Sequence, residues 1–215
     1  MKFRVPFLNP LFDLINNEVN DKKIDFDNRL LKLMPNSNLK GYWQTFSYYL
    51  DLVKNNLVPT IDLKKPSPEY EFMKNRILSE KLPISIHIRR GDYKTATDLF
   101  GLLGFKYYEE AVKLAHTKDA SYFVFSDTMN EAKEILEPLK LQNITFVENL
   151  KNPAEDLLMM SFCKINIIAN STFSMWGAVI NPNGRAVIAP SPQFVNSKIK
   201  DVTIPNAKLI NPYFS

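Results

Sequence analysis

The sequence predicts an α/β fold built on a parallel sheet, and three observations support this. From residue 83 onward, short runs rich in β-branched and aromatic residues alternate with segments of helical periodicity. Some of these runs, such as residues 165–169, are nearly continuous apolar stretches, which is typical of strands buried on both faces. Helix-start signals lie between them, including Asn152 followed by Pro153 and Glu155. Together these patterns predict a sheet covered by helices on both sides.

The first 80 residues have a different pattern, which predicts helical and irregular structure. Candidate helices span residues 10–19, 24–34, 42–57 and 68–80. The last one has Ser67 as a capping residue and Pro68 at its first position. The helix at 42–57 is rich in aromatic side chains, which at helical spacing favours core packing over a sugar-binding platform. We therefore expect a domain boundary between residues 80 and 81.

The elements of the α/β region are predicted to alternate strictly along the chain. The expected strands cover residues 83–89, 121–126, 144–148, 164–169 and 185–189, and the expected helices cover 105–117, 129–139, 153–162 and 172–180. Thr128 with Glu131 marks one helix start by the spacing of a capping box. The tail after residue 190 contains several prolines and is expected to be extended or irregular. Ligands of such sheets bind beyond the carboxyl ends of the strands, so the residues that follow each strand are the candidates for a site.

The composition excludes several classes of protein. The chain has 215 residues, of which 45% are hydrophobic and 23% charged, which is typical of a globular protein. A net charge of +4 suits an acidic ligand, and the absence of clustered Lys/Arg runs argues against nucleic-acid binding. The single cysteine, Cys163, excludes an intramolecular disulfide and fits a reducing compartment. No apolar run approaches the roughly 18–20 residues of a membrane span.

The end of the first strand in this region carries a group of polar side chains: His87, Arg89, Arg90 and Asp92. In the run from 84 to 93, an alternating apolar pattern gives way to two arginines, a glycine and a carboxylate. Arginine is well suited to hold phosphate through paired N–H donors. The pattern therefore indicates the anion-binding end of a nucleotide-sugar site. The alternative is a strand end with a surface charge cluster.

Two further strand ends also carry polar residues. Asp127 follows the strand at 121–126, and it fits equally well a ligand of nucleotide hydroxyl or ring N–H groups and a helix cap. The strand at 164–169 is followed by Asn170, Ser171, Thr172 and Ser174. A helix start there offers free N–H groups and a positive dipole end, which favour a phosphate. Capping explains one of the three hydroxyls but not all of them. Asp156 lies in the first turn of the preceding helix, where its negative charge interacts favourably with the positive end of the helix dipole.

Sequence signals for other chemistries are weak. Neither the P-loop pattern G-x-x-x-x-G-K-[ST] nor the dinucleotide pattern G-x-G-x-x-G occurs. Two histidines and one cysteine leave few strong metal ligands. Asp25 and Asp27 formally match a D-x-D metal motif, but they lie in a predicted helix rather than at a strand end, and we interpret them as surface charge. We therefore expect no metal ion and no cofactor.

Taken together, the three strand ends resemble the α-1,2-fucosyltransferases of glycosyltransferase family 11, which are related to the α-1,6- and protein O-fucosyltransferases. The matching segments are His-Ile-Arg-Arg-Gly-Asp-Tyr at 87–93, Phe-Ser-Asp at 125–127, and the block from 156 to 177 with Asn-Ser-Thr-Phe-Ser at 170–174. The similarity extends over about residues 40–195. The first and last of these motifs, in this order, are specific for the family.

The resemblance implies a GT-B-like fold with two lobes. Residues 81–215 would form the Rossmann-like lobe that binds GDP-fucose as donor substrate, and residues 1–80 a partial, helical acceptor-side region. The implied reaction is metal-independent transfer of L-fucose, with inversion, to the 2-hydroxyl of a terminal β-galactoside. Arg89 would contact the β-phosphate of the leaving GDP, and Asp92 is the candidate base. The expected donor-binding residues are His87, Arg89, Arg90, Asp127, Asp156, Asn170, Ser171, Thr172 and Ser174.

The sequence also departs from the family pattern. Members usually begin with a Gly-rich segment containing G-G-L-G-N-Q, which is missing here. The alternative function is therefore a non-catalytic remnant that binds a GDP-sugar or a glycan, and RNA binding is a weaker third hypothesis. The expected partners are GDP-fucose and a galactoside-terminated oligosaccharide, with no nucleic acid. We expect a cytoplasmic protein with peripheral association at the inner face of a membrane.

Overall fold

The computed structural model describes residues 18–20, 38–40, 60–180, 186–195, 204 and 206–213. The chain divides into two compact units, residues 1–57 and 58–215. In the first unit, β1 (Glu18–Asn20) pairs in parallel with β2 (Asn38–Lys40). The helix predicted at 10–19 is therefore wrong at its end, where β1 begins. The rest of that helix and the helices predicted at 24–34 and 42–57 lie outside the described residues.

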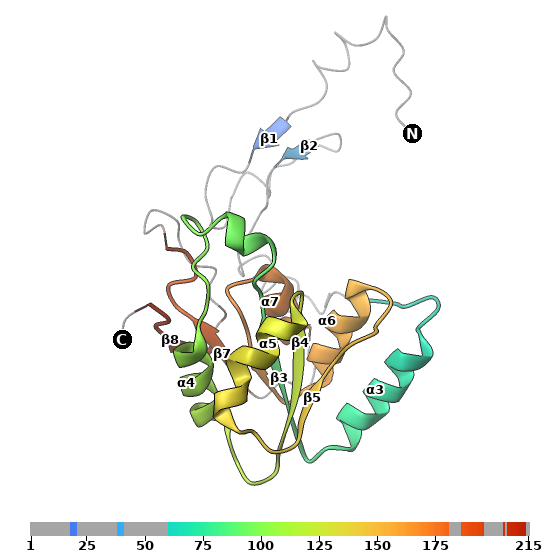
Figure 1. Cartoon of the computed structure of the whole chain (residues 1–215). Coiled ribbons are helices and arrows are strands. Elements are labelled where there is room, and N and C mark those ends of the chain that lie inside the picture. The colour runs from blue at the N-terminus through green and yellow to red at the C-terminus, as the bar shows by residue number, and fades with distance from the viewer. Residues whose placement is uncertain are drawn as a thin grey trace, which may run out of the picture. The chain divides into compact units, whose positions relative to one another are not determined.

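The second unit contains a parallel sheet of six described strands in the order β5-β4-β3-β6-β7-β8 (Figure 1). The strands are β3 (Leu82–Ile88), β4 (Ala120–Ser126), β5 (Ile144–Phe146), β6 (Ile165–Ile167), β7 (Ala186–Pro190) and β8 (Lys208–Ile210). The first five match the strands predicted from the sequence. β8 is an addition, because it forms in the tail for which only extended or irregular chain was expected.

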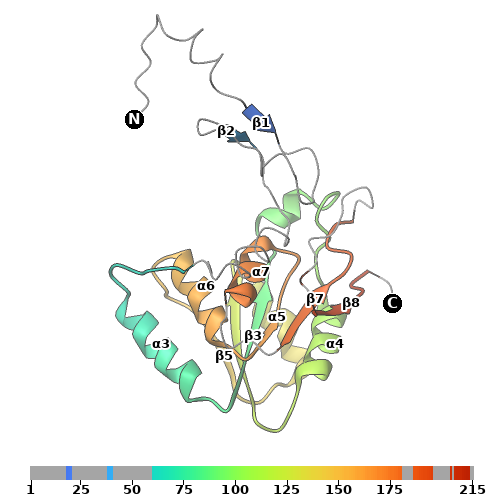
Figure 2. The same ribbon diagram turned by 180° about the vertical axis from the view of Figure 1, so that it is seen from behind.

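Helices cover both faces of this sheet (Figures 1 and 2). One face carries α4 (Phe105–Ala115) and α5 (Met129–Leu136), and the other carries α3 (Pro68–Ser79), α6 (Pro153–Phe162) and α7 (Thr172–Val179). A 3-10 turn, η3 (Glu137–Leu139), follows α5 where proline enters the chain, so the helix predicted at 129–139 ends early. The structure confirms the predicted α/β, Rossmann-like class.

β3 separates two different interiors. Ile84, Ile86 and Ile88 are fully buried in the apolar core under α4 and α5. Burial of each such side chain stabilises the fold by about 1.5–3 kcal/mol. The alternate residues face the other way: the Ser85 hydroxyl accepts a hydrogen bond from Asn166 Nδ2 at 2.7 Å, and the His87 ring lies 5.7 Å from that of Phe173 in α7. The polar side of β3 therefore faces α6 and α7.

α3 packs with the sheet domain, and this moves the boundary between the units. The Ser67 hydroxyl accepts from the backbone N–H of Tyr70, as the predicted cap requires. Glu155 in the first turn of α6 accepts from the Ser67 backbone N–H at 2.8 Å and from its hydroxyl at 2.9 Å. Tyr70 and Ile77 join the apolar cluster of α6. The division at 57/58 thus lies upstream of the boundary expected at 80/81.

The strand order determines where a ligand is expected. The chain runs from β3 outward to β4 and β5, then crosses to β6 and continues in the opposite direction to β7 and β8. Doubly wound sheets bind ligands beyond the carboxyl ends of the strands at such a switch point. Here the switch point lies between β3 and β6, whose following loops are residues 89–91 and 168–171.

Candidate functional site

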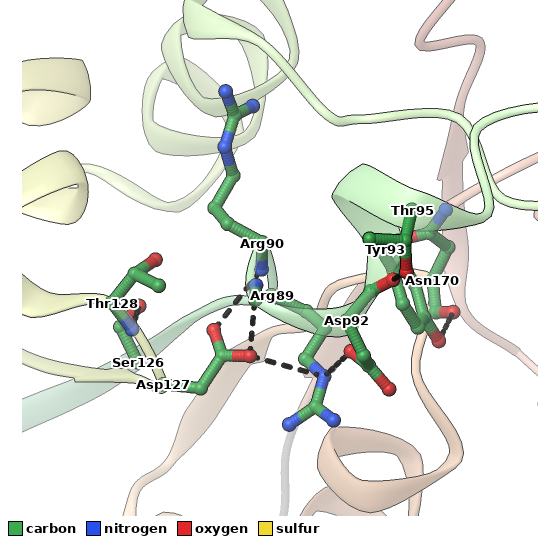
Figure 3. A network of polar contacts seen from close by, with 10 residues as sticks. Arg89, Arg90, Asp92, Tyr93, Thr95, Ser126, Asp127, Thr128 and Asn170 are labelled. Carbon is green, nitrogen blue, oxygen red and sulfur yellow. Dashed lines mark hydrogen bonds and ion pairs between the residues drawn. The ribbon is translucent and has the colours of Figure 1, made fainter.

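The loop after β3 and the end of β4 bring three charged side chains together (Figure 3). Arg89 Nε donates to Asp92 Oδ1 at 2.9 Å and lies 3.3 Å from Asp127 Oδ2. Figure 3 shows both carboxylates on the Nε side of the guanidinium, with its two terminal nitrogens pointing away from them. Within the part of the chain that the structure describes, these Nη groups donate no hydrogen bond. Their N–H donors are free to bind an anion.

Arg89 and Asp92 are ionised at neutral pH. The hydrogen bond from Arg89 lowers the pKa of Asp92 below its usual value, and the same bond raises the pKa of Arg89. The Asp92 side chain, on the 3-10 turn η2 (Asp92–Thr95), is 62% exposed, whereas that of Asp127 is 23% exposed. Asp92 is therefore the carboxylate that a ligand in solvent can approach.

Asp127 also binds the backbone of the loop after β3. Its Oδ1 accepts from the N–H of Arg90 and its Oδ2 from the N–H of Gly91, each at 3.0 Å. The helix-cap alternative is wrong, because the N-cap of α5 is Thr128 and no side chain forms a capping hydrogen bond there. Contact between Asp127 and a nucleotide stays a prediction.

The two neighbouring arginines have different surroundings. Arg90 extends away from Arg89 in Figure 3, toward the face covered by α4 and α5. Its Nε lies 3.3 Å from Glu131 Oε2, and its Nη1 donates to the Leu103 carbonyl at 3.3 Å. Glu131 also pairs with Lys94. The structure therefore places Arg89, but not Arg90, beside the carboxylates, and donor binding by Arg90 stays a prediction.

Tyr93 joins the loop after β3 to the loop after β6, and the sequence analysis did not identify this role. Its hydroxyl donates to the Asn170 carbonyl at 2.9 Å, and the Arg89 guanidinium lies 5.8 Å from its ring centroid. Burial raises the pKa of Tyr93, while a hydrogen bond with the Ser171 side chain acts in the opposite direction. Arg89 and the start of α7 are thus connected through one residue. The only feature of the sequence that pointed to Tyr93 was its place in the motif at 87–93.

The polar residues after β6 gather at the start of α7 but differ in their availability. Ser174 is fully buried, and its hydroxyl donates to the Ser171 carbonyl at 3.1 Å. Asn170 Nδ2 donates to two backbone carbonyls of neighbouring loops, those of Gly101 at 2.8 Å and Gln193 at 3.1 Å. Ser171 is the N-cap residue without a capping side-chain bond, and Thr172 is half-buried. Of the residues predicted to bind the phosphate, Ser171 and Thr172 have the hydroxyls that lie nearest the start of α7.

His87 and Asp156 lie on the α6 and α7 side with strongly perturbed pKa values. Burial, helped by the Arg89 charge, lowers the pKa of His87 to about 3, so the ring is neutral at physiological pH. Its Nδ1 is buried without a partner among the described residues. Burial and the neighbouring charge of Glu155 raise the pKa of Asp156 to about 6. Such perturbed groups are frequent in functional sites.

The described residues contain neither a cluster of metal ligands nor a helix that could span a membrane. No three His, Cys, Asp or Glu side chains gather there as a metal ion requires. None of the described helices is long and apolar enough to cross a bilayer. Peripheral membrane association and cytoplasmic location stay predictions.

Comparison with known sequences shows similarity to glycosyltransferases. The family model described as Glycosyl transferase family 11 matches residues 11–209. Two Escherichia coli proteins are each 29% identical to this chain: the O-antigen biosynthesis glycosyltransferase WbnK over 181 residues, and an alpha-1,2-colitosyltransferase over 170 residues. These matches cover 77% and 74% of this chain but only 60% and 57% of the relatives. The chain therefore spans less than two thirds of the length of either relative.

Solved structures show weaker similarity. NodZ alpha-1,6-fucosyltransferase soaked with GDP-fucose matches with 14% identity and a TM-score of 0.45, over 89% of this chain and 63% of that one. POFUT1 in complex with GDP-fucose matches with 17% identity and a TM-score of 0.39, over 57% of this chain and 46% of that one.

Proposed function

The chain belongs to glycosyl transferase family 11, and on this premise we propose that it transfers L-fucose from GDP-fucose to the 2-hydroxyl of a terminal β-galactoside, with inversion and without a metal ion. Three observations support the proposal: the family match, the motifs at the three strand ends, and the position of Arg89 at the switch point of the sheet. The alternative is a protein that binds a GDP-sugar or a glycan without turnover.

The observation that carries the proposal is the orientation of the Arg89 guanidinium. Its Nε is bound on the carboxylate side, and its terminal donors point the other way. When the bond between the sugar C1 and the β-phosphate oxygen breaks, negative charge grows on that phosphate. Donors arranged in advance around such a charge contribute about 3–4 kcal/mol each to lowering the barrier. Arg89 is already held for this task before the donor binds.

The start of α7 is proposed as the second group that stabilises the leaving diphosphate. Free backbone N–H groups and the positive end of the helix dipole favour an anion there, and the hydroxyls of Ser171 and Thr172 add two donors. Tyr93 connects this helix start to the loop that carries Arg89. Tyr93 therefore links the two halves of the proposed phosphate site by direct contacts.

Asp92 is proposed to accept the proton of the acceptor hydroxyl. The acceptor oxygen forms the new bond to the sugar C1 on the face opposite the departing GDP, and its proton passes to the Asp92 carboxylate. Because Arg89 holds the pKa of Asp92 low, this carboxylate is a weak base. Weak assistance suits a reaction in which the leaving group departs well before the acceptor oxygen attacks.

Asp156 is proposed to bind the guanosine, and the buried His87 to help position it. An ionised Asp156 accepts ring N–H groups, and the neutral His87 has a buried nitrogen without a partner in the described part of the chain. Both lie on the side of the sheet that faces α6 and α7.

The test is incubation of the chain with GDP-fucose and lactose. We expect release of GDP together with a fucosylated lactose linked at the galactose 2-hydroxyl, identified by mass spectrometry and NMR. Binding of GDP-fucose without product supports the alternative of a binding protein. Because one relative is an alpha-1,2-colitosyltransferase, GDP-colitose is assayed in parallel, and a strong preference for it overturns the assignment of fucose.

A further inference from the structure

We propose that Asp127 is a positioning residue that sets the orientation of Arg89, rather than a group that binds the nucleotide. The inference rests on the proposed function, in which Arg89 is the group that contacts the leaving phosphate. We use the name Asp127 latch for Asp127 together with its two backbone donors, the N–H groups of Arg90 and Gly91, and its ion pair with Arg89 Nε.

The chemistry of the Asp127 latch requires a carboxylate. Two backbone N–H groups donate to Asp127, one to each carboxylate oxygen at 3.0 Å, and the positively charged Arg89 Nε lies 3.3 Å from Oδ2. A carboxylate accepts at both oxygens and satisfies both N–H groups, whereas the amide of asparagine turns a donor toward one of them. The pattern of donors therefore selects Asp over its isosteric neighbour Asn.

The sheet places Asp127 where this contact is possible. Ile88 and Ser126 are register partners on adjacent parallel strands, so Arg89 and Asp127 are the residues that follow the last pair. β4 thus delivers the carboxylate beside the loop from a rigid element. A functional side chain that is held from a strand keeps its geometry better than one held by its own loop.

Gly91 is the residue that the latch requires on the loop side. A Cβ at this position would lie 2.6 Å from Asp127 Oδ2 and 3.3 Å from its Cγ. Any larger residue therefore forces the carboxylate away from its two backbone donors and from Arg89. The glycine of the motif at 87–93 is explained by this close approach, and the N-cap φ of −38° shows that a positive φ is not the reason.

Asp92 and Asp127 contact the same nitrogen but differ in what else they bind. Asp92 Oδ1 accepts from Arg89 Nε within its own turn, and its side chain is largely exposed. Both oxygens of Asp127 are engaged with the loop. Asp127 therefore has less capacity left for a ribose hydroxyl or a guanine N–H than the family resemblance implies.

A double-mutant cycle tests this inference. Asp127→Asn is made in the wild-type chain and in Arg89→Ala, and kcat, KM and GDP affinity are measured. The matched control is Asp119→Asn, at a carboxylate that pairs with Lys81 just before β4 begins. Displacement of Arg89 by about 1 Å is expected to lower kcat about 100-fold for Asp127→Asn. In the Arg89→Ala background the same change is expected to alter kcat by less than about twofold, because the two residues act as one unit.

Guanosine affinity is the control measurement, because a general loss of structure would weaken it whereas the displacement of Arg89 alone would not. Guanosine carries no phosphate, so its affinity is expected to stay the same in Asp127→Asn. The inference is overturned if Asp127→Asn lowers activity equally in the wild-type and Arg89→Ala backgrounds, or if it weakens guanosine binding. Either result favours direct contact between Asp127 and the nucleotide.

A stability measurement separates failure of this inference from failure of the proposed function. Gly91→Ala is expected to lower the thermal midpoint in the wild-type chain but to have little further effect in Asp127→Ala, where the clash is gone. The thermal midpoint can be measured even if the chain shows no transferase activity. Equal effects of Gly91→Ala in the two backgrounds overturn the Asp127 latch, whatever the chain does with GDP-fucose.

Discussion

The face of the sheet under α4 and α5 is apolar along β3, whereas the face under α6 and α7 has polar groups in its interior. On the first face the isoleucines of β3 pack with Tyr107 and Tyr108, whose hydroxyls donate to the carbonyls of Ile168 and His87. On the second face Asn166 donates to Ser85, and His87 has a buried nitrogen without a partner among the described residues. One strand therefore contributes to two different environments.

This difference teaches that stability and chemistry are divided between the two sides of β3. A buried polar atom without a partner costs about 1–3 kcal/mol, so such atoms persist where they serve a purpose. The polar row of β3 continues through Ser85 and His87 to Arg89, which ends it at the site. The apolar row ends at Ile88 in the core. Substitutions on the two rows are therefore expected to have separable effects.

The largest effect is expected from Ile86→Ala, on the apolar row. Ile86 is fully buried, and truncation to alanine leaves a cavity that lowers the free energy of unfolding by up to about 5 kcal/mol. Chemical denaturation measures the loss. Transferase activity per folded molecule is expected to match that of the wild-type chain. A loss of activity without a loss of stability would contradict the division between the rows.

Arg89→Ala is expected to have the next largest effect, on catalysis rather than stability. Loss of a donor to the leaving phosphate raises the barrier by about 3–4 kcal/mol and lowers kcat at least about 100-fold. Its ion pairs are partly exposed and contribute about 0–1 kcal/mol each to stability. Steady-state kinetics and thermal unfolding measure the two quantities, with Arg76→Ala on α3 as the matched control. A fully active Arg89→Ala chain would refute the assignment of this residue.

Tyr93→Phe tests the connection between the loop after β3 and the start of α7. The change removes only the hydroxyl that donates to the Asn170 carbonyl, and the ring still stacks on Phe100. We expect a loss of stability of about 0.5–1.5 kcal/mol, the net contribution of one hydrogen bond. If the two halves of the phosphate site are coupled, GDP affinity falls as well. Unchanged GDP affinity would show that they are independent.

A pH-dependent effect on stability is expected from the titration of Asp156. Its pKa of about 6 in the folded chain lies above the usual value of about 3.9, so the native state binds the proton more tightly than the unfolded state. The stabilising contribution of the protonated group is present below about pH 4 and is lost as the pH rises through 6. Asp156→Asn is therefore expected to gain stability relative to wild type between about pH 4 and pH 8. Chemical denaturation of both chains at the two pH values measures this gain. A difference in stability that does not change with pH would contradict the raised pKa of Asp156.

Local signals account for most of what the sequence predicted correctly. The caps at Ser67 and Asn152 place the starts of α3 and α6, because a capping side chain bonds to backbone groups two or three residues away. Alternation within β3 reflects the period of a strand. β8 was missed because a short edge strand is defined by its pairing with β7, and the three residues carry no periodicity of their own.

The amino-acid sequence by itself determined the α/β class, the order of the elements, and the strand ends at which charged residues collect, because periodicity and capping act over a few residues. Only the tertiary structure decided how those residues are used: that Arg90 turns to Glu131, that Tyr93 reaches Asn170, and that Asp127 binds the loop after β3. These partners lie 41, 77 and 37 positions apart in the chain. Contacts between such distant residues are set by the packing of the sheet, which no local pattern encodes.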